Sequence, residues 1–407
     1  MCDRIETLDD EIHAFVAESV AETRISAQLA RLENERRDRQ FRPPLYGVPV
    51  ALKDVFRADG FPTKAGSSLP TELLDGPESA VVRALRDLGA VVVGKTVTTE
   101  FTHLPTGETR NPHAVDHTPG GSSSGSAAAV AAGMCPLALG SETTGSVIRP
   151  AAFCGVVGFR PTTGRLPTEG LISLAPTADT VGLFTQDLEG VRRVASLLCT
   201  NWTTRRRPGS LPTIGVPTGP YLDQASQAAI RRFRAQVSSL ESAGFEVERM
   251  RFFDDIQEIN TLHDALLAAE AAGVHAEWYT RYPARYSAEM AELVARGDDV
   301  SVETLGRAKR SMKRTRASVE SAFASADLDV IVAPPAPSVA PEGLDDDGDP
   351  VMNLPWTHAG VPTVTLPVGS TDAGLPYGIA CIGRFGRDEG LLSHSRTIDE
   401  QFRDTSD

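Results

Sequence analysis

The sequence predicts an α/β protein, a single large domain over residues 1–407 with a central mixed β-sheet covered by helices on both faces. Two observations predict this class. Apolar stripes at helical spacing alternate along the chain with short apolar runs that are typical of buried strands. The sequence also shows no repeat of about 20 to 50 residues, which argues against a solenoid or a propeller.

The first predicted elements follow from this periodicity in chain order. Residues 9–36 read as one or two surface helices, because apolar residues recur at helical spacing among charged ones. The apolar run Gly47–Leu52 reads as a buried strand that ends abruptly at Lys53. A helix over Glu78–Leu88 ends at a glycine, and the apolar residues 90–93 follow as another strand.

The second half of the chain continues the αβ pattern. A helical stripe over residues 230–240 precedes a short strand at Phe245–Val247. Two further strands with prolines at their ends are expected at Asp327–Pro335 and Val361–Val368. Within the single domain we expect a catalytic core at about 45–200, a variable helical region at about 220–325 and returning strands at about 326–400.

Composition and charge exclude several classes of partner. Hydrophobic residues make up 41% and charged residues 23% of the chain, which is ordinary for a globular enzyme. The formal net charge of −14 opposes binding to phosphate backbones and anionic membranes, so we expect no nucleic acid and no membrane as partner. The longest basic run, Arg205–Arg207, is expected to be a solvated loop. The N-terminal sequence lacks a leader pattern, so we expect a cytoplasmic protein, with a homodimer as an open alternative.

Cysteines, histidines and acidic runs do not form a recognisable metal or cofactor motif. The five scattered cysteines include no CxxC pair, and Cys154 is expected to be a packing residue. His113 and His117 have an HxxxH spacing, but neighbouring prolines argue against the helix that would align them. The run Asp345–Asp349 lacks the glycine and glutamate positions of a calcium loop and is expected to be solvated. We therefore expect no metal and no bound cofactor.

Three segments carry residues suited to nucleophilic catalysis. In Thr118–Gly133, glycines and hydroxyl residues precede an alanine-rich run, a pattern that helix capping or anion binding would also explain. In Gly140–Gly155, Ser146 follows a glycine, and the preceding backbone N–H groups can converge on an oxyanion. Lys53 ends a buried strand, where desolvation lowers the pKa of an amine. The alternative for Lys53 is a side chain that extends from the strand end to solvent.

Together these segments resemble the amidase signature family, whose members use a serine nucleophile, a bridging serine and a lysine. Ser122 and Ser146 have the same spacing as the two serines of the family. The matching segments are Gly47–Asp54, Pro119–Gly133, Gly140–Arg165 and Asn353–Gly369. The likeness covers nearly the whole chain and implies the amidase signature fold.

The resemblance also implies the roles of individual residues. Ser146 would be the nucleophile, Ser122 the bridging serine, joined to its preceding glycine by a cis peptide bond, and Lys53 the general base. The implied oxyanion hole consists of the backbone amides of Thr143, Thr144, Gly145 and Ser146. Candidate substrate contacts are Gly121, Ser123, Trp356 and His358, with packing as an equal alternative for the last two.

The implied activity is hydrolysis of a small-molecule carboxamide through an acyl-enzyme on Ser146, with release of ammonia or an amine. Two alternatives stay open: a glutaminase-type subunit of a tRNA-dependent amidotransferase, and a non-catalytic member of the fold. The sequence departs from the common family pattern at three positions. Thr144 replaces a glycine, Glu142 replaces an aspartate, and Arg149 stands one position later than the usual arginine.

Overall fold

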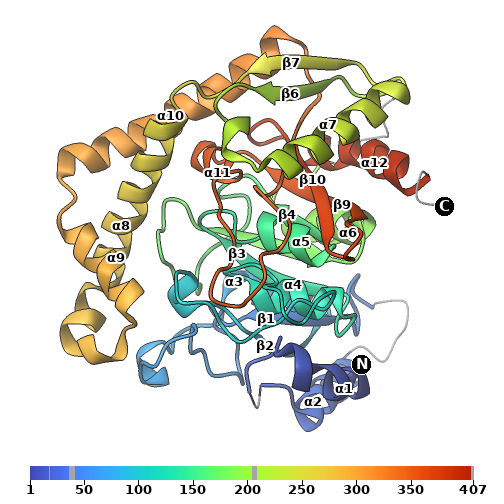
Figure 1. The fold of residues 1–407 in the computed structure, drawn as a ribbon. Helices are drawn as coiled ribbons and strands as arrows, with labels where there is room; N and C mark the ends of the chain where they lie inside the picture. Colours follow the sequence, from blue (N-terminus) through green and yellow to red (C-terminus); the bar gives the residue numbers. More distant parts are fainter. Residues whose placement is uncertain (18, 36–41, 204–208, 405–407) are drawn as a thin grey trace.

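Ten strands form one mixed β-sheet at the centre of the computed structural model, which describes residues 1–17, 19–35, 42–203 and 209–404 (Figure 1). The strands are β1 (Pro49–Lys53), β2 (Val91–Thr96), β3 (Leu137–Glu142), β4 (Val157–Arg160), β5 (Thr180–Thr185), β6 (Ile214–Thr218), β7 (Val247–Arg251), β8 (Val330–Ala333), β9 (Thr363–Ser370) and β10 (Pro376–Ile382). Their order across the sheet is β2-β1-β3-β5-β4-β9-β10-β8-β6-β7. The β2-β1-β3 and β8-β6-β7 ends are parallel, whereas the pairs between β3 and β8 are antiparallel.

Helices connect and cover these strands (Figure 1). The described α-helices are α1 (Cys2–Ile12), α2 (Glu22–Glu35), α3 (Ala80–Asp87), α4 (Ser124–Ala131), α5 (Ile148–Cys154), α6 (Leu188–Leu198), α7 (Gln227–Ser242), α8 (Ile256–Arg281), α9 (Ala288–Asp298), α10 (Val302–Ser325), α11 (Leu354–Ala359) and α12 (Asp388–Asp404). Short 3-10 helices occur at η2 (Thr71–Leu73), η3 (Glu100–Thr102), η4 (Leu222–Gln224) and η5 (Pro283–Arg285). In Figure 1, α8, α9 and α10 stand together along one side of the sheet.

Side chains of β1 alternate between the two faces of the sheet. Val50 and Leu52 pack with residues of α3 and α6 in one apolar core, whereas Ala51 packs with residues of α1 and α4 in another. Successive side chains of a strand point to opposite faces, so both faces are covered by helices. The predicted class, a single α/β domain around a mixed sheet, is confirmed.

Parallel pairing brings the ends of β1 and β3 to the same edge of the sheet. Leu52 pairs with Leu139, so Lys53 at the end of β1 lies beside the last residues of β3. In α/β sheets, ligands bind in the crevice outside the carboxyl ends of parallel strands. The sheet topology therefore places Lys53 next to the turn that follows β3, which contains Ser146.

Most predicted elements are present, but their ends differ. The strand expected at Phe245–Val247 begins only at Val247, as β7, and its neighbour β6 has no counterpart among the predicted elements. The run Arg205–Arg207 lies outside the described residues. Within the described part of the chain, no helix is both long and apolar enough to cross a membrane.

Of the two interpretations of residues 9–36, the pair of helices is the one observed, as α1 and α2, with non-helical residues between them. Helix α1 ends at Ile12, and His13 adopts the left-handed conformation with φ 54°. The Asp9 carboxylate accepts the backbone N–H of Ala14 at 2.7 Å, which ends the helix in place of another turn. Phe15 then forms a bridge with Thr96 of β2. Apolar spacing continues through this break because Phe15 is buried against the sheet rather than on a helix face.

We predict that Gly125→Ala lowers the free energy of unfolding by about 1–3 kcal/mol, the usual cost of overpacking. Gly125 lies in α4, where an added Cβ would lie 2.1 Å from Ala14 O and 2.5 Å from Val97 N. Gly273→Ala in α8 is the matched control, because no atom lies within 4 Å of its added Cβ. Alanine should stabilise that position by about 0.5–1 kcal/mol. Chemical denaturation measures both, and equal effects of the two changes would contradict this packing.

Candidate active site

The amine of Lys53 is buried at the end of β1 and is surrounded by hydroxyl and carbonyl oxygens. Its Nζ lies 2.7 Å from Ser122 Oγ, 3.0 Å from Ser141 Oγ and 3.3 Å from Ser141 O. The lysine side chain is 0% exposed. Among the described residues, no carboxylate forms an ion pair with it, in contrast to Lys95, whose Nζ lies 2.7 Å from Asp54 Oδ1.

Burial lowers the pKa of Lys53 to about 7, because the charged form loses its hydration. The nearby carboxylates of Asp179, Glu142 and Asp347 act in the opposite direction, and Arg149 adds to the lowering. The amine is therefore neutral in a large fraction of molecules near pH 7 and can accept a proton there.

Ser122 lies two residues before α4, and the Gly121–Ser122 peptide bond is cis, as the resemblance implies. Next to it, Ser123 Oγ donates to Ser141 O at 3.1 Å. One turn further on, Ser126 Oγ donates to Leu139 O at 2.8 Å. These bonds attach the start of α4 to β3, so the bridging-serine candidate and the strand next to Lys53 are held together.

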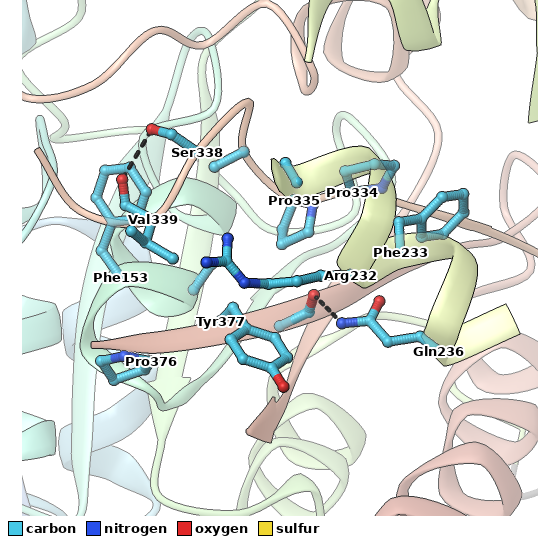
Figure 2. Close-up of a pocket in the computed structure, with 14 residues that line it drawn as sticks. Phe153, Arg232, Phe233, Gln236, Pro334, Pro335, Ser338, Val339, Pro376 and Tyr377 are labelled. Atoms are coloured by element: carbon cyan, nitrogen blue, oxygen red, sulfur yellow. Dashed lines mark hydrogen bonds between the residues drawn. The ribbon is translucent and has the colours of Figure 1, made fainter. Parts of the chain in front are cut away.

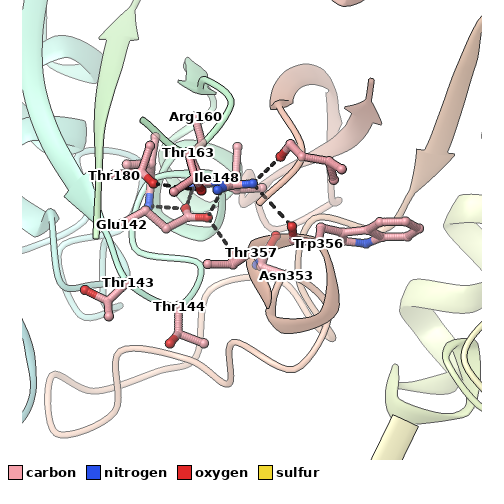
Figure 3. A network of polar contacts seen from close by, with 12 residues as sticks. Glu142, Thr143, Thr144, Ile148, Arg160, Thr163, Thr180, Asn353, Trp356 and Thr357 are labelled. Atoms are coloured by element: carbon pink, nitrogen blue, oxygen red, sulfur yellow. Dashed lines mark hydrogen bonds and ion pairs between the residues drawn. The ribbon is translucent and has the colours of Figure 1, made fainter. Parts of the chain in front are cut away.

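Ser146 lies in the turn between β3 and α5, and a buried carboxylate anchors this turn (Figure 3). Glu142 Oε2 accepts the backbone N–H groups of Val147 at 2.8 Å and Ile148 at 3.1 Å. Arg160 of β4 pairs with the same carboxylate at 3.3 Å, and Thr357 Oγ1 of α11 donates to it at 2.9 Å. Three elements of the fold thus hold the segment that begins directly after Ser146.

The candidate oxyanion segment consists of residues 143–146. Gly145 has a φ of 71°, and an added Cβ would lie 2.9 Å from Asn353 Nδ2, so both conformation and space favour glycine there. Thr143 Oγ1 donates to Asp179 Oδ1 at 2.5 Å. The Thr143–Asp179 bond and the close approach of Asn353 to Gly145 therefore restrict the backbone of this turn, as a preorganised oxyanion site requires.

Arg149 of α5 connects the two serine-bearing segments. Its Nη2 donates to Gly121 O at 2.8 Å and its Nε to Asp347 O at 2.8 Å. The same Nη2 pairs with Asp347 Oδ2 at 3.0 Å. The acidic run Asp345–Asp349 is therefore not a fully solvated loop, because its central carboxylate lies beside the catalytic candidates.

The four candidate substrate contacts differ in their surroundings. An added Cβ on Gly121 would lie 2.3 Å from Asp347 Oδ2, so a side chain there would displace the Asp347 carboxylate. Ser123 is buried and bonded to β3, as described above. Trp356 is 2% exposed and its Nε1 donates to Tyr221 OH at 2.9 Å. These contacts fit a packing role for Trp356 rather than a substrate contact. His358 is buried in contact with another histidine, His263.

A separate surface pocket lies between α7, β10 and the segment 334–339 (Figure 2). Pro334, Pro335, Phe233 and Tyr377 form apolar walls, and Arg232 extends across it with its guanidinium 5.5 Å from the Tyr377 ring centre. Of the described residues that line it, none belongs to the catalytic candidates. This pocket therefore does not mark the site of the chemistry.

The histidines and Cys154 that the sequence raised as alternatives have structural partners. His113 Nε2 lies 3.0 Å from Cys154 O, and His117 Nδ1 lies 2.8 Å from Asp116 Oδ1. Within the described ranges, no group of three His, Cys, Asp or Glu side chains is arranged to hold a metal ion. Burial raises the pKa of the Cys154 thiol well above its usual range, which disfavours the thiolate.

Sequence reasoning missed several residues that contact the candidate site. Ser141 follows a strand pattern, and nothing in its spacing distinguishes it from a core hydroxyl. Asp179 and His263 lie far from the recognised motifs and reach the turn through tertiary packing. Asp347 belongs to an acidic run whose pattern suggests only an incomplete calcium loop. The neighbouring Gly348 packs closely in the structure, where an added Cβ would lie 2.7 Å from Phe153, but nothing in the sequence marks this contact.

Comparisons with known proteins agree with this arrangement. A family model described as Amidase matches residues 1–392. A glutamyl-tRNA(Gln) amidotransferase subunit of Synechococcus sp. (strain WH7803) is 30% identical over 457 residues, covering 99% of this chain and 92% of the relative.

Similar solved structures cover the same extent. One, described as the crystal structure of amidase, has a TM-score of 0.88 and 26% identity, and covers 100% of this chain and 94% of its own. The peptide amidase from Stenotrophomonas maltophilia has a TM-score of 0.83 and 27% identity, covering 99% of this chain and 92% of its own. The chain therefore belongs to the amidase family, and it is an amide-cleaving enzyme.

Proposed function

We propose that this protein hydrolyses a small carboxamide through an acyl-enzyme on Ser146, with Ser122 as bridging serine and Lys53 as general base. The observation that carries the proposal is the buried hydrogen bond between Lys53 Nζ and Ser122 Oγ, 2.7 Å long. A buried amine with a pKa of about 7, bonded to a hydroxyl, is suited to general-base catalysis. Such an arrangement also activates a serine in the way that histidine does in other hydrolases.

In the proposed reaction, neutral Lys53 accepts a proton from Ser122 as Ser122 accepts one from Ser146. The Ser146 oxygen bonds to the amide carbonyl carbon, and backbone N–H groups of residues 143–146 stabilise the resulting oxyanion. The C–N bond then breaks, and the nitrogen leaves with the proton that Lys53 had taken. Water attacks the ester by the same proton path, which releases the carboxylate and restores Ser146.

The names of the relatives favour one alternative function, that of an amidotransferase subunit. Relatives at about 30% identity are named as a subunit of glutamyl-tRNA(Gln) amidotransferase. We infer as a second candidate that this chain releases ammonia from an amide for a partner protein. Ammonia release from glutamine and from simple amides, measured with the purified chain alone, separates the two: a free hydrolase acts unaided on simple amides, whereas a subunit needs its partners.

We predict that Ser146→Ala abolishes amide turnover and that wild-type kcat/KM rises with pH and levels off above about pH 7, where Lys53 has lost its proton. Lys53→Met should lose activity by orders of magnitude at every pH, because methionine cannot accept a proton. Circular dichroism of both variants controls for folding. A rate maximum near pH 5 on the same substrate would exclude a neutral lysine as the base.

The burial of the Lys53 amine should also lower the stability of the folded protein. Between pH 10.5, the ordinary pKa, and pH 7, the unfolded chain binds the Lys53 proton and the folded chain does not. The free energy of unfolding therefore falls as pH decreases through this window, and at pH 7 the full cost is on the order of a few kcal/mol. Lys53→Met should remove this cost and raise Tm.

Lys95→Met is the matched control for that change. Lys95 is equally buried, but its removal leaves the Asp54 carboxylate buried without its cation. This should destabilise the protein by about 3–5 kcal/mol. Thermal unfolding of both variants at pH 7 tests the contrast, and a lower Tm in Lys53→Met than in wild type would refute the account of Lys53.

Asp347→Asn should shift the acidic limb of the pH–rate profile to lower pH. The Asp347 carboxylate raises the pKa of Lys53, so its loss lets the amine lose its proton at lower pH. Asp345→Asn is the matched control, because Asp345 is exposed in the same loop. A shift to higher pH, or equal shifts in both variants, would show that Asp347 does not act on Lys53 electrostatically.

A further inference from the structure

A histidine from the outer helix α8 contacts the candidate oxyanion segment. His263 Nε2 lies 3.2 Å from the backbone carbonyl oxygen of Thr143 and 2.9 Å from Thr144 Oγ1. His263 is 0% exposed, so these contacts replace water rather than supplement it. Thr144 is one of the departures from the common family pattern, and its hydroxyl is what meets the imidazole.

The contact with the Thr143 carbonyl determines the direction of a neighbouring N–H. Among the described residues, cis peptide bonds occur at Leu104–Pro105 and Gly121–Ser122, so the peptide between residues 143 and 144 is trans. In a planar trans peptide, the carbonyl and the N–H point in opposite directions. A carbonyl held towards α8 therefore directs the N–H of Thr144 away from α8. That N–H is one of the candidate oxyanion donors.

A second histidine, His358, contacts the other ring nitrogen of His263. A carbonyl oxygen only accepts, so a hydrogen bond to Thr143 O needs the proton on Nε2 of His263, whereas the Thr144 hydroxyl accepts or donates and fits either tautomer. In the Nε2–H tautomer, Nδ1 of His263 is an acceptor and lies 3.2 Å from Nδ1 of His358, which must donate. Both imidazoles stay neutral, because burial lowers the pKa of His263 to about 4 and that of His358 to about 3. The opposite tautomer of His263 would release the Thr143 carbonyl.

We propose that His263, held in its Nε2–H tautomer by His358, is a positioning residue that orients the Thr144 N–H for oxyanion binding. The inference rests on the proposed function, since it assigns a donor to the oxyanion that forms when Ser146 attacks. The two histidines lie on α8 and α11, outside the three segments that carry Lys53, Ser122 and Ser146. His263 acts on the reaction through the backbone and does not touch the reacting atoms.

The kinetic test compares two substitutions of His263. Gln places an amide donor near the position of Nε2 and should keep most of kcat, whereas Leu removes the donor. Deleting an oxyanion donor outright lowers kcat by about 10²–10³, and loss of its positioning should lower kcat in His263→Leu by about 10- to 100-fold. KM should change little, because the oxyanion forms only after the substrate binds.

His275→Leu is the matched control, because His275 is a fully buried histidine of the same helix whose Nδ1 bonds Tyr286 OH at 2.9 Å. This variant should lose stability and keep its kcat per folded molecule. The inference is overturned if His263→Leu keeps wild-type kcat, if Gln fails to restore it, or if His275→Leu loses kcat to the same extent.

A spectroscopic measurement separates this inference from the proposed function. Nitrogen-15 chemical shifts of histidine-labelled wild-type protein should show His263 protonated at Nε2 and His358 protonated at Nδ1, each assigned by its loss in a His→Gln variant. A His263 protonated at Nδ1 overturns the inference even in an active enzyme. If the predicted tautomers are present but no amide is hydrolysed, the positioning of the turn stands and the proposed function fails.

Discussion

A buried amine, which forms no ion pair with a carboxylate in the described part of the chain, is the constraint around which the Lys53 end of the sheet is organised. Lys53 Nζ is bonded to the oxygens of Ser122 and Ser141, which lie beside α4 and on β3. Neutral partners do not offset the loss of hydration, so the pKa falls to about 7. Parallel pairing of β1 and β3, and the close approach of α4 to the sheet, supply the packing that holds the amine in place.

The turn that carries Ser146 is restrained from three directions, and each restraint uses a different kind of contact. Glu142, paired with Arg160, holds the start of α5 through two backbone N–H groups. Asp179 accepts the Thr143 hydroxyl from another side. His263 reaches the Thr143 carbonyl from α8. Two of the departures from the family pattern, Glu142 and the threonine at position 144, are therefore accompanied by partners elsewhere in the chain.

Local pattern was enough to predict the class of fold, the strand that ends at Lys53 and the two serine-bearing turns. These features depend on short-range chemistry: apolar runs, glycines that permit tight turns and a fixed spacing between Ser122 and Ser146. The contacts of His263 and Asp347 could not be predicted, because they depend on how α8 packs against the turn after β3 and how a long loop packs against α5. The position of the break after Ile12 was not predicted for a related reason, since burial against a strand imitates helical spacing over a few residues.

The central claim is that Ser146 is the nucleophile activated through Ser122 by Lys53. Peptide mapping by mass spectrometry after reaction with a fluorophosphonate tests it most directly, because the reagent forms a stable adduct with an activated serine. We expect a single adduct on Ser146 in the wild-type protein and strongly slowed labelling in Lys53→Met at the same pH. An adduct on another residue, or equal labelling rates in the two proteins, would contradict the account.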